Sequence, residues 1–206
     1  MFTEFEIASM IEIPAIHEAT IALKKDFVRN EAPYLEISDH DFFSLVMMAP
    51  TVGIALANGS VSLFEELALN KKARKLSKGG YFMKKDPVVY AMKFLIKKYD
   101  TWCDKFYTLL QTSIEHSFNY EGLNKQEFDQ EKEVSYTEYK RLVLRQPYIL
   151  IRFISSFFLE NDEEIISENR VIGKKEYEVM LRIGEKLGLS SIPVFQMFCK
   201  TFTVKG

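Results

Sequence analysis

The feature that most constrains the fold is a long run of apolar residues at helical spacing that begins at Asp86-Pro87. From Val88 to Ile114, apolar side chains recur every three or four residues, which is the period of one helix face. Asp86 suits the cap of such a helix, and Pro87 suits its first turn. The pattern predicts a single helix of about 30 residues, ~45 Å long, as the spine of the fold.

Helix signals of the same kind occur on both sides of this run, whereas the apolar–polar alternation typical of strands is hard to find. Glycine and proline contribute only 9 and 6 of the 206 residues, and 47% of the chain is hydrophobic. Few turn-forming residues and many large apolar side chains favour long helices. We therefore predict an all-α fold of roughly eight helices.

Cap residues and prolines predict the boundaries of the remaining helices. Thr3 with Glu6 and Ser135 with Glu138 form capping-box patterns, in which side chains satisfy free backbone N–H groups at a helix start. The other expected starts are Pro14, Ser38, Lys174 and Pro193, the last with Ser191 as its cap, and the expected ends are Pro33, Leu187 and Phe202. Pro50 is expected to kink the third helix, and the polar segment 119–133 to form a long loop.

The charge and the apolar stretches narrow the class of protein. A formal charge of -2 gives no strong nucleic-acid signal, and Cys103 and Cys199 cannot by themselves build a disulfide framework. The most apolar stretches, 45–57 and 148–159, are shorter than the ~20 residues of a membrane span, and the N-terminus does not resemble a signal peptide. We therefore expect a cytoplasmic protein with free thiols and no transmembrane segment.

A short turn pattern occurs twice, at residues 58–65 and, 111 positions later, at residues 169–176. We call these the first corner and the second corner. In the first, Asn58-Gly59 favours left-handed backbone that ends a helix, and Ser62 with Glu65 favours a capping box that starts the next one. In the second, Arg170 and Gly173 replace the glycine and the capping serine. We expect the helix that follows the second corner to fray more readily.

At these residues the chain resembles the TerB-like family, named for tellurite-resistance proteins. The family's loop, Asp-Gly-x-Ile/Val-x-x-x-Glu, is matched at Asn58, Gly59, Val61 and Glu65, and again at Asn169, Ile172 and Glu176. The closing stretch 180–190, with its Leu-Gly-Leu-Ser ending, is also similar to that family. The resemblance implies an N-terminal helical extension over 1–37 and a TerB-like domain over 38–206. It also implies a non-enzymatic binding or scaffold protein, related to stress response, that acts through a protein partner or self-association.

The resemblance also implies a divalent-cation site at the paired corners, formed by Asn58, Glu65, Asn169 and Glu176. Hard cations such as Ca²⁺ need several anionic or carbonyl oxygens. Here asparagine replaces both of the family's loop aspartates, which removes two negative charges. We therefore expect a degenerate site in which the corners are mainly structural. No cofactor is expected, and a divalent cation is the one ion that the resemblance suggests.

The segment 71–85 is the strongest local departure from charge balance, because it holds seven basic residues and no acidic one. These residues are Lys71, Lys72, Arg74, Lys75, Lys78, Lys84 and Lys85. They suit an anionic surface, either lipid head groups in a peripheral membrane contact or nucleic acid. The alternative is a solvated helix end whose cations complement the helix dipole. An acidic cluster at 160–168 offers a surface for a basic partner, including the 71–85 segment of a second copy.

One enzymatic alternative remains open. His17, the dipeptide His40-Asp41 and a later Asp100 or Asp104 occur in the order of metal-dependent phosphohydrolases of the HD type, which they resemble. In such enzymes imidazoles and carboxylates hold a metal ion that activates water. Asp41 also fits a simpler role as a carboxylate in the first turn of a helix.

Overall fold

The computed structural model describes residues 2–79, 86–118, 135–160, 162–167 and 170–206. This part of the chain is predominantly helical, which confirms the predicted all-α class. The α-helices are α1 (Glu4–Ile11), α2 (Pro14–Glu31), α3 (Asp39–Met47), α4 (Ala49–Ala55), α5 (Leu63–Leu76), α6 (Pro87–Lys97), α7 (Tyr99–Ser117), α8 (Tyr136–Arg145), α9 (Tyr148–Phe158), α10 (Lys174–Lys186) and α11 (Pro193–Lys200). Short 3₁₀ helices are η1 (Leu56–Asn58), η2 (Asp162–Ile166) and η3 (Leu189–Ser191), and the strands are β1 (Arg170–Gly173) and β2 (Phe202–Lys205).

Most of the expected helix starts are confirmed by cap contacts. Ser38 accepts a hydrogen bond from the Asp41 N–H at 3.0 Å, and Asp86 accepts one from the Val88 N–H at 2.9 Å. The Thr3 N–H donates to the Glu6 carboxylate at 2.7 Å. The helical path also breaks between α3 and α4, next to the predicted kink. The predicted loop at 119–133 lies outside the described residues.

The prediction of one continuous spine helix is wrong. The chain leaves helical geometry at Lys98, with φ -119° and ψ 25°, so that α6 and α7 are separate helices. Both helices contact α3 and α4, but α6 alone also packs closely on α5, and α7 packs most extensively on α2. Tertiary packing therefore overrides a periodicity that would suit either one helix or two.

The chain also contains a strand pair that the sequence pattern did not predict. β1 and β2 run parallel, with Arg170 opposite Phe202 and Gly173 opposite Lys205. The last helix therefore ends at Lys200, and not at Phe202 as predicted. The prediction of Ser191 as its cap is also wrong, because the Ser191 hydroxyl donates to the Gly188 carbonyl at 3.3 Å within η3.

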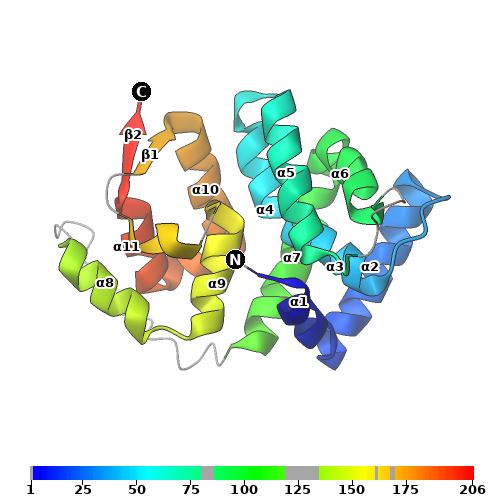
Figure 1. The fold of residues 1–206 in the computed structure, drawn as a ribbon, viewed down its shortest axis with the longest axis horizontal. Coiled ribbons are helices and arrows are strands. Elements are labelled where there is room, and N and C mark those ends of the chain that lie inside the picture. Colours follow the sequence, from blue (N-terminus) through cyan, green and yellow to red (C-terminus); the bar gives the residue numbers. More distant parts are fainter. Residues whose placement is uncertain (1, 80–85, 119–134, 161, 168–169) are drawn as a thin grey trace.

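Figure 1 shows two groups of helices, α1–α7 on one side and α8–α11 with the strand pair on the other. The groups meet where α4 contacts α9 and α10. Phe27 of α2 is fully buried and packs against Phe42, Trp102 and Phe106, with ring centroids 5.0 to 5.6 Å apart. The stretch predicted as an N-terminal extension thus contributes a central side chain to the first group.

The N-terminal segment also reaches the second group. The ring of Phe2 lies 4.7 Å from that of Phe153 on α9, and the Phe2 N–H donates to the Ser156 hydroxyl at 2.7 Å. Glu6 of α1 pairs with Arg152 of α9, with 2.6 Å between Oε1 and Nη2. The first residues therefore form a strap across the junction of the two groups.

Within the described residues, the helical stretch Asp39–Asn58 has the length and apolar character that a membrane span needs. It is weak evidence of a span, because 72% of its apolar window is buried inside the fold, as in the core helix of a soluble protein. Cys103 and Cys199 are free thiols, as expected.

Candidate functional site

The first corner has the geometry that its sequence predicts. Gly59 takes a left-handed conformation, with φ +94°, directly after η1. The Glu65 carboxylate accepts hydrogen bonds from the Ser62 N–H at 2.7 Å and the Ser62 hydroxyl at 2.6 Å, while Ser62 accepts from the Glu65 N–H at 3.3 Å. These hydrogen bonds lower the pKa of Glu65. The predicted capping box is therefore present, and its carboxylate is engaged within the corner.

The second corner reaches α10 by a different route. Its residues from Arg170 onward form β1, so a strand and not a helix leads into the turn. Gly173 has no side chain that could cap the helix, so only one half of a capping box is present. In that half, the Gly173 N–H donates to the Glu176 carboxylate at 3.0 Å. Asn169, the predicted ligand in this loop, lies outside the described residues.

The structure brings the two corners into direct contact. The Asn58 side-chain amide donates to the Glu176 carboxylate at 3.0 Å, across 118 residues of sequence. One oxygen of Glu176 therefore accepts from Asn58 and the other from Gly173. Among the predicted cation ligands, Asn58 and Glu176 come together, while Glu65 bonds to Ser62. A donor amide directed at the carboxylate stands where a cation ligand would present an oxygen.

The helices after the corners are buried at equivalent positions. Each begins at the same point of the pattern, 111 residues apart. Equivalent buried pairs are Leu69 with Met180, Lys72 with Ile183, Ala73 with Gly184, and Leu76 with Leu187. This agreement supports an internal duplication, and it identifies one exception: a lysine occupies a core position in α5 where α10 has isoleucine.

The sequence grouped Lys72 with a solvated basic surface, and the structure shows that this is wrong. Its side chain is only 9% exposed, because it lies on the same helix face as Leu69 and Leu76. The ammonium group donates to the Thr51 hydroxyl at 3.0 Å and to the Leu159 carbonyl at 3.3 Å. Burial lowers the pKa of Lys72 to about 8, and the nearby carboxylates of Glu160 and Glu164 oppose that shift.

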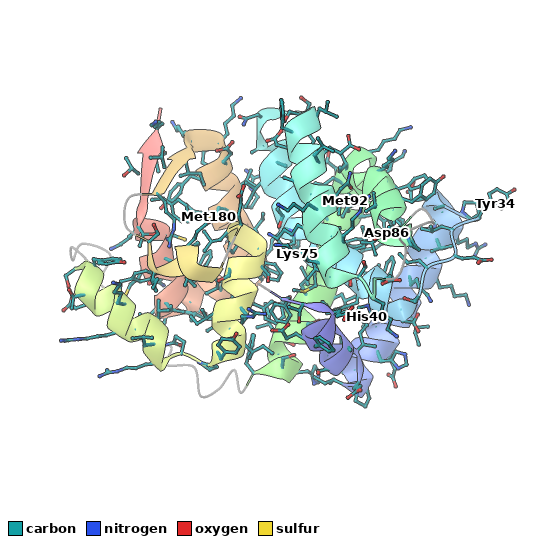
Figure 2. All side chains as sticks on the ribbon, in the orientation of Figure 1. Tyr34, His40, Lys75, Asp86, Met92 and Met180 are labelled. Carbon is teal, nitrogen blue, oxygen red and sulfur yellow. The ribbon has the colours of Figure 1, made fainter. Side chains whose placement is uncertain are left out.

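A groove of about 680 Å³ runs along α5 from the first corner to the end of α9. Its apolar lining includes Ile54, Ala55, Leu69, Phe157, Phe158, Val171 and Phe202. Its charged lining consists of Glu65, Lys71, Lys72, Lys75, Glu160, Glu164 and Arg170. Figure 2 shows Lys75 at the edge of α5 that faces α9. Parts of the predicted basic and acidic segments thus line the same groove within one chain.

Arg170 closes one side of this groove. Its guanidinium group lies over the rings of Phe198 and Phe202, at 5.1 and 5.3 Å, and its Nη1 donates to the Thr201 hydroxyl at 2.5 Å. Burial lowers the pKa of Arg170, and the Tyr139 hydroxyl, which interacts with the guanidinium group, opposes that shift. The Arg170 side chain is therefore held by aromatic rings and hydroxyl groups beside the groove.

The remaining basic residues are divided by their exposure. Lys71, Arg74, Lys75 and Lys78 are exposed, whereas Lys84 and Lys85 lie outside the described residues. The predicted anion-binding set therefore splits into one buried cation, Lys72, and an exposed group that lies on α5 and just beyond it.

The residues of the phosphohydrolase alternative bond to their own neighbours. His40 Nε2 lies 3.0 Å from the Glu4 carbonyl, and His40 Nδ1 lies 3.4 Å from Asp41. Asp41 is fully buried and accepts from the Lys78 N–H at 3.1 Å, while His17 lies 3.6 Å from Asp39. Asp104 pairs with Lys186. Among the described residues, no three His, Cys, Asp or Glu side chains form a group that could hold a metal ion.

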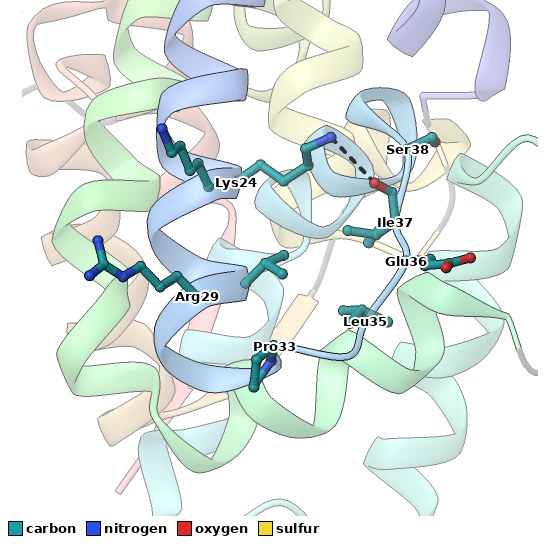
Figure 3. Close-up of a pocket in the computed structure, with 9 residues that line it drawn as sticks. Lys24, Arg29, Pro33, Leu35, Glu36, Ile37 and Ser38 are labelled. Carbon is teal, nitrogen blue, oxygen red and sulfur yellow. Dashed lines mark hydrogen bonds between the residues drawn. The ribbon is translucent and has the colours of Figure 1, made fainter.

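A second cavity, of about 810 Å³, lies between α2 and the loop before α3 (Figure 3). Lys24 spans it, donates to the Ile37 carbonyl at 3.4 Å and pairs with Asp39. Arg29, Pro33 and Leu35 complete much of its lining. This cavity contains none of the predicted site residues.

Comparison of the chain with family models, with curated proteins and with solved structures found no match.

Proposed function

We propose that the chain is a non-enzymatic binding or scaffold protein of the TerB-like type, and that the groove beside its paired corners receives a protein partner. The observation that carries this proposal is the hydrogen bond from Asn58 to Glu176, which joins the two corners directly. The TerB-like resemblance places its two loops in such a pair. A role related to stress response is what the same resemblance implies, and the cytoplasmic location is the one expected from the free thiols and the N-terminal sequence.

The contacts at the corners favour a clamp over a working cation site. Glu176 accepts hydrogen bonds at both oxygens, and Glu65 accepts two from Ser62. A divalent cation would have to displace these donors and find other oxygens. In our proposal the two carboxylates instead fix the helix starts, and thereby set the separation of the two walls of the groove.

The composition of the groove suits a segment of a partner protein. Phenylalanine side chains and charges of both signs line one continuous surface, which matches a peptide with apolar and charged residues. Lys72 and Arg170 bring positive charge to the apolar part, and Glu160 and Glu164 bring negative charge to its rim. Because positive and negative charges both line the groove, they favour one register of a bound peptide, whereas charges of a single sign would attract any oppositely charged partner.

The substitution Asn58→Asp tests the proposed clamp, because it restores the family's aspartate. It removes the donor to Glu176 and places two carboxylates side by side, so we expect a loss of about 1–2 kcal/mol in unfolding free energy. Added Ca²⁺ or Mg²⁺ should raise the melting temperature of this variant and leave that of the wild type unchanged. Thermal unfolding with and without each cation measures both effects.

Two variants serve as controls for this experiment. Asn58→Ala removes the donor without adding charge, and Asn70→Asp makes the same chemical change on α5 away from the corners. Neither should respond to the cations. Stoichiometric cation binding by the wild type that is lost in Glu176→Gln would contradict the clamp and establish a working cation site.

Elemental analysis of the purified full chain tests the non-enzymatic part of the proposal. A stoichiometric transition metal that disappears in His40→Ala and Asp41→Ala would favour the phosphohydrolase alternative instead. We expect these substitutions to change stability alone, because His40 and Asp41 bond to the chain around them.

A further inference from the structure

The outer face of α5 combines an exposed apolar group with an exposed basic group, and of these residues only Lys71 and Lys75 also line the groove of the proposed function. Its first two turns carry Leu63, Phe64 and Leu67, which are 70%, 84% and 58% exposed. Its later turns carry Lys71, Arg74 and Lys75, also exposed, and Lys78 follows just beyond the helix end. Because residues three and four apart share a helix face, these side chains form one stripe along about 21 Å of helix. We call this stripe the α5 ridge.

The ridge contains no acidic side chain. Glu65 and Glu66 lie on the flanks of the helix and are half-buried, while the buried face consists of Leu69, Lys72, Ala73 and Leu76. Figure 1 shows α5 on the near face of the molecule. The ridge therefore presents an apolar end and a cationic end to the outside, and Glu160 and Glu164 line the same groove as Lys71 and Lys75 at its edge.

The second corner helix supplies an internal comparison. The three exposed apolar residues of the ridge have charged equivalents in α10. These equivalents are Lys174, Lys175 and Glu178, and all three are exposed. The equivalent of Arg74 is Glu185. Exposed apolar residues are therefore not a requirement of this helix position, since its duplicate carries charged residues there. Adjacent exposed apolar side chains typically mark an interaction surface.

We propose that the α5 ridge docks on an anionic lipid bilayer, with Leu63, Phe64 and Leu67 inserted at the level of the head groups and the basic residues above them. Charge complementarity carries the choice of partner, because four exposed cations and no acidic residue on the ridge itself match an anionic lipid surface. Lysine is depleted at protein interfaces, yet three of these four cations are lysines.

Co-sedimentation of the full chain with vesicles tests this proposal. We expect binding to vesicles of phosphatidylcholine with phosphatidylserine, weak binding to phosphatidylcholine alone, and a loss of binding as salt is raised. The variant Lys71→Ala/Arg74→Ala/Lys75→Ala should lower the affinity on the order of a hundredfold. The variant Leu63→Gln/Phe64→Gln/Leu67→Gln keeps the charge and should lower it on the order of tenfold. All six positions are exposed, so both variants should fold, which circular dichroism checks.

A matched control removes the same positive charge from another surface. Lys25→Ala/Lys93→Ala/Lys97→Ala changes three exposed cations of α2 and α6, and should weaken binding only a few-fold. Equal losses in the control and the ridge variant would overturn the proposal, as would binding that neither ridge variant weakens. Binding to a polyglutamate peptide without binding to vesicles would also overturn it, and would identify an acidic protein as the partner.

Discussion

The two corners lead into their helices in different ways. In the first, a 3₁₀ turn, a left-handed Gly59 and a complete capping box lead into α5. In the second, a strand leads into α10, and Glu176 alone satisfies the start of the helix through the Gly173 N–H. The strand pairs with β2, which gives the second corner backbone hydrogen bonds that the first corner lacks. Tertiary pairing therefore compensates for weaker local capping.

The helices after the corners differ in their buried faces, and here the second one is the more conventional. α10 buries Ile183 and Gly184, so its packed face is apolar and close to its neighbour. α5 buries Lys72 at the position of Ile183, with a groove beside it. At equivalent positions, α10 therefore buries an apolar side chain and α5 buries a charged one. Both of our proposals place binding at α5 and not at α10.

The largest expected effect comes from making α5 resemble α10 at this position. Because Lys72 has a pKa of about 8 in the folded state and 10.5 as its reference value, the unfolded state binds more protons between these pH values. Lys72 should therefore add roughly 3 kcal/mol to the unfolding free energy between pH 8 and pH 10.5, against an opposing loss from Cys199 and the buried tyrosines, whose pKa values are raised. Lys72→Met should lack the Lys72 contribution and keep the opposing loss.

Urea unfolding across this pH range measures the difference between the wild type and Lys72→Met. Lys75→Met, a change at an exposed lysine on the same helix, is the control and should follow the wild type. If the wild type and Lys72→Met showed parallel pH profiles, Lys72 would not be a buried amine.

The next effect tests the close packing of α10. A Cβ at Gly184 would overlap the ring of Phe195, so we expect Gly184→Ala to lose about 2 kcal/mol in unfolding free energy despite its better helix propensity. The reciprocal change, Ala73→Gly, should cost about 1 kcal/mol through propensity and a small cavity. Chemical denaturation of both variants compares the helices. A Gly184→Ala variant as stable as the wild type would show that the two helix faces have equal room.

The smallest effects concern the caps. Ser62→Ala should cost about 1 kcal/mol, because it removes the hydroxyl that accepts from the Glu65 N–H. Gly173→Ser supplies the missing hydroxyl at φ -68°, and its Cβ would lie 3.0 Å from Oε2 of Glu176, at the end of a side chain that can shift. We expect a gain of about 0.5 kcal/mol. Thermal unfolding measures both. A loss of stability in Gly173→Ser would show that the glycine is required by the strand pair and not merely tolerated.

Local chemistry in the sequence accounts for most of the helix starts. Ser38, Asp86 and Ser135 accept from backbone N–H groups as their positions predict, because a cap acts within three residues. No cap residue or proline stands at Lys98, where α6 ends. We attribute the break there to the packing of α6 and α7 on neighbouring helices, which local sequence does not reveal. β2 was missed for the same reason: four residues form a strand only because β1, about 30 positions away, supplies the partner.

The candidate site was only partly accessible from the sequence. The corners were found from Asn58, Glu65 and Glu176, but their contact depends on the packing of α10 against η1 and α4. Lys72 was grouped with its basic neighbours because it lies in a charged run. Its spacing of three from Leu69 and four from Leu76 is the signal that places it on the buried face instead.

The strap from Phe2 to Ser156 has a consequence for synthesis of the chain on the ribosome. The two residues that form its hydrogen bond are 154 positions apart. At a translation rate of about 5–20 residues per second, roughly 8–30 s pass between their appearances. During this interval α1 has α3 and α5 as partners, but α9 has not been made. Phe2 and α1 are therefore translated well before α9, and the contacts of Phe2 with Phe153 and Ser156 form only after α9 has been made.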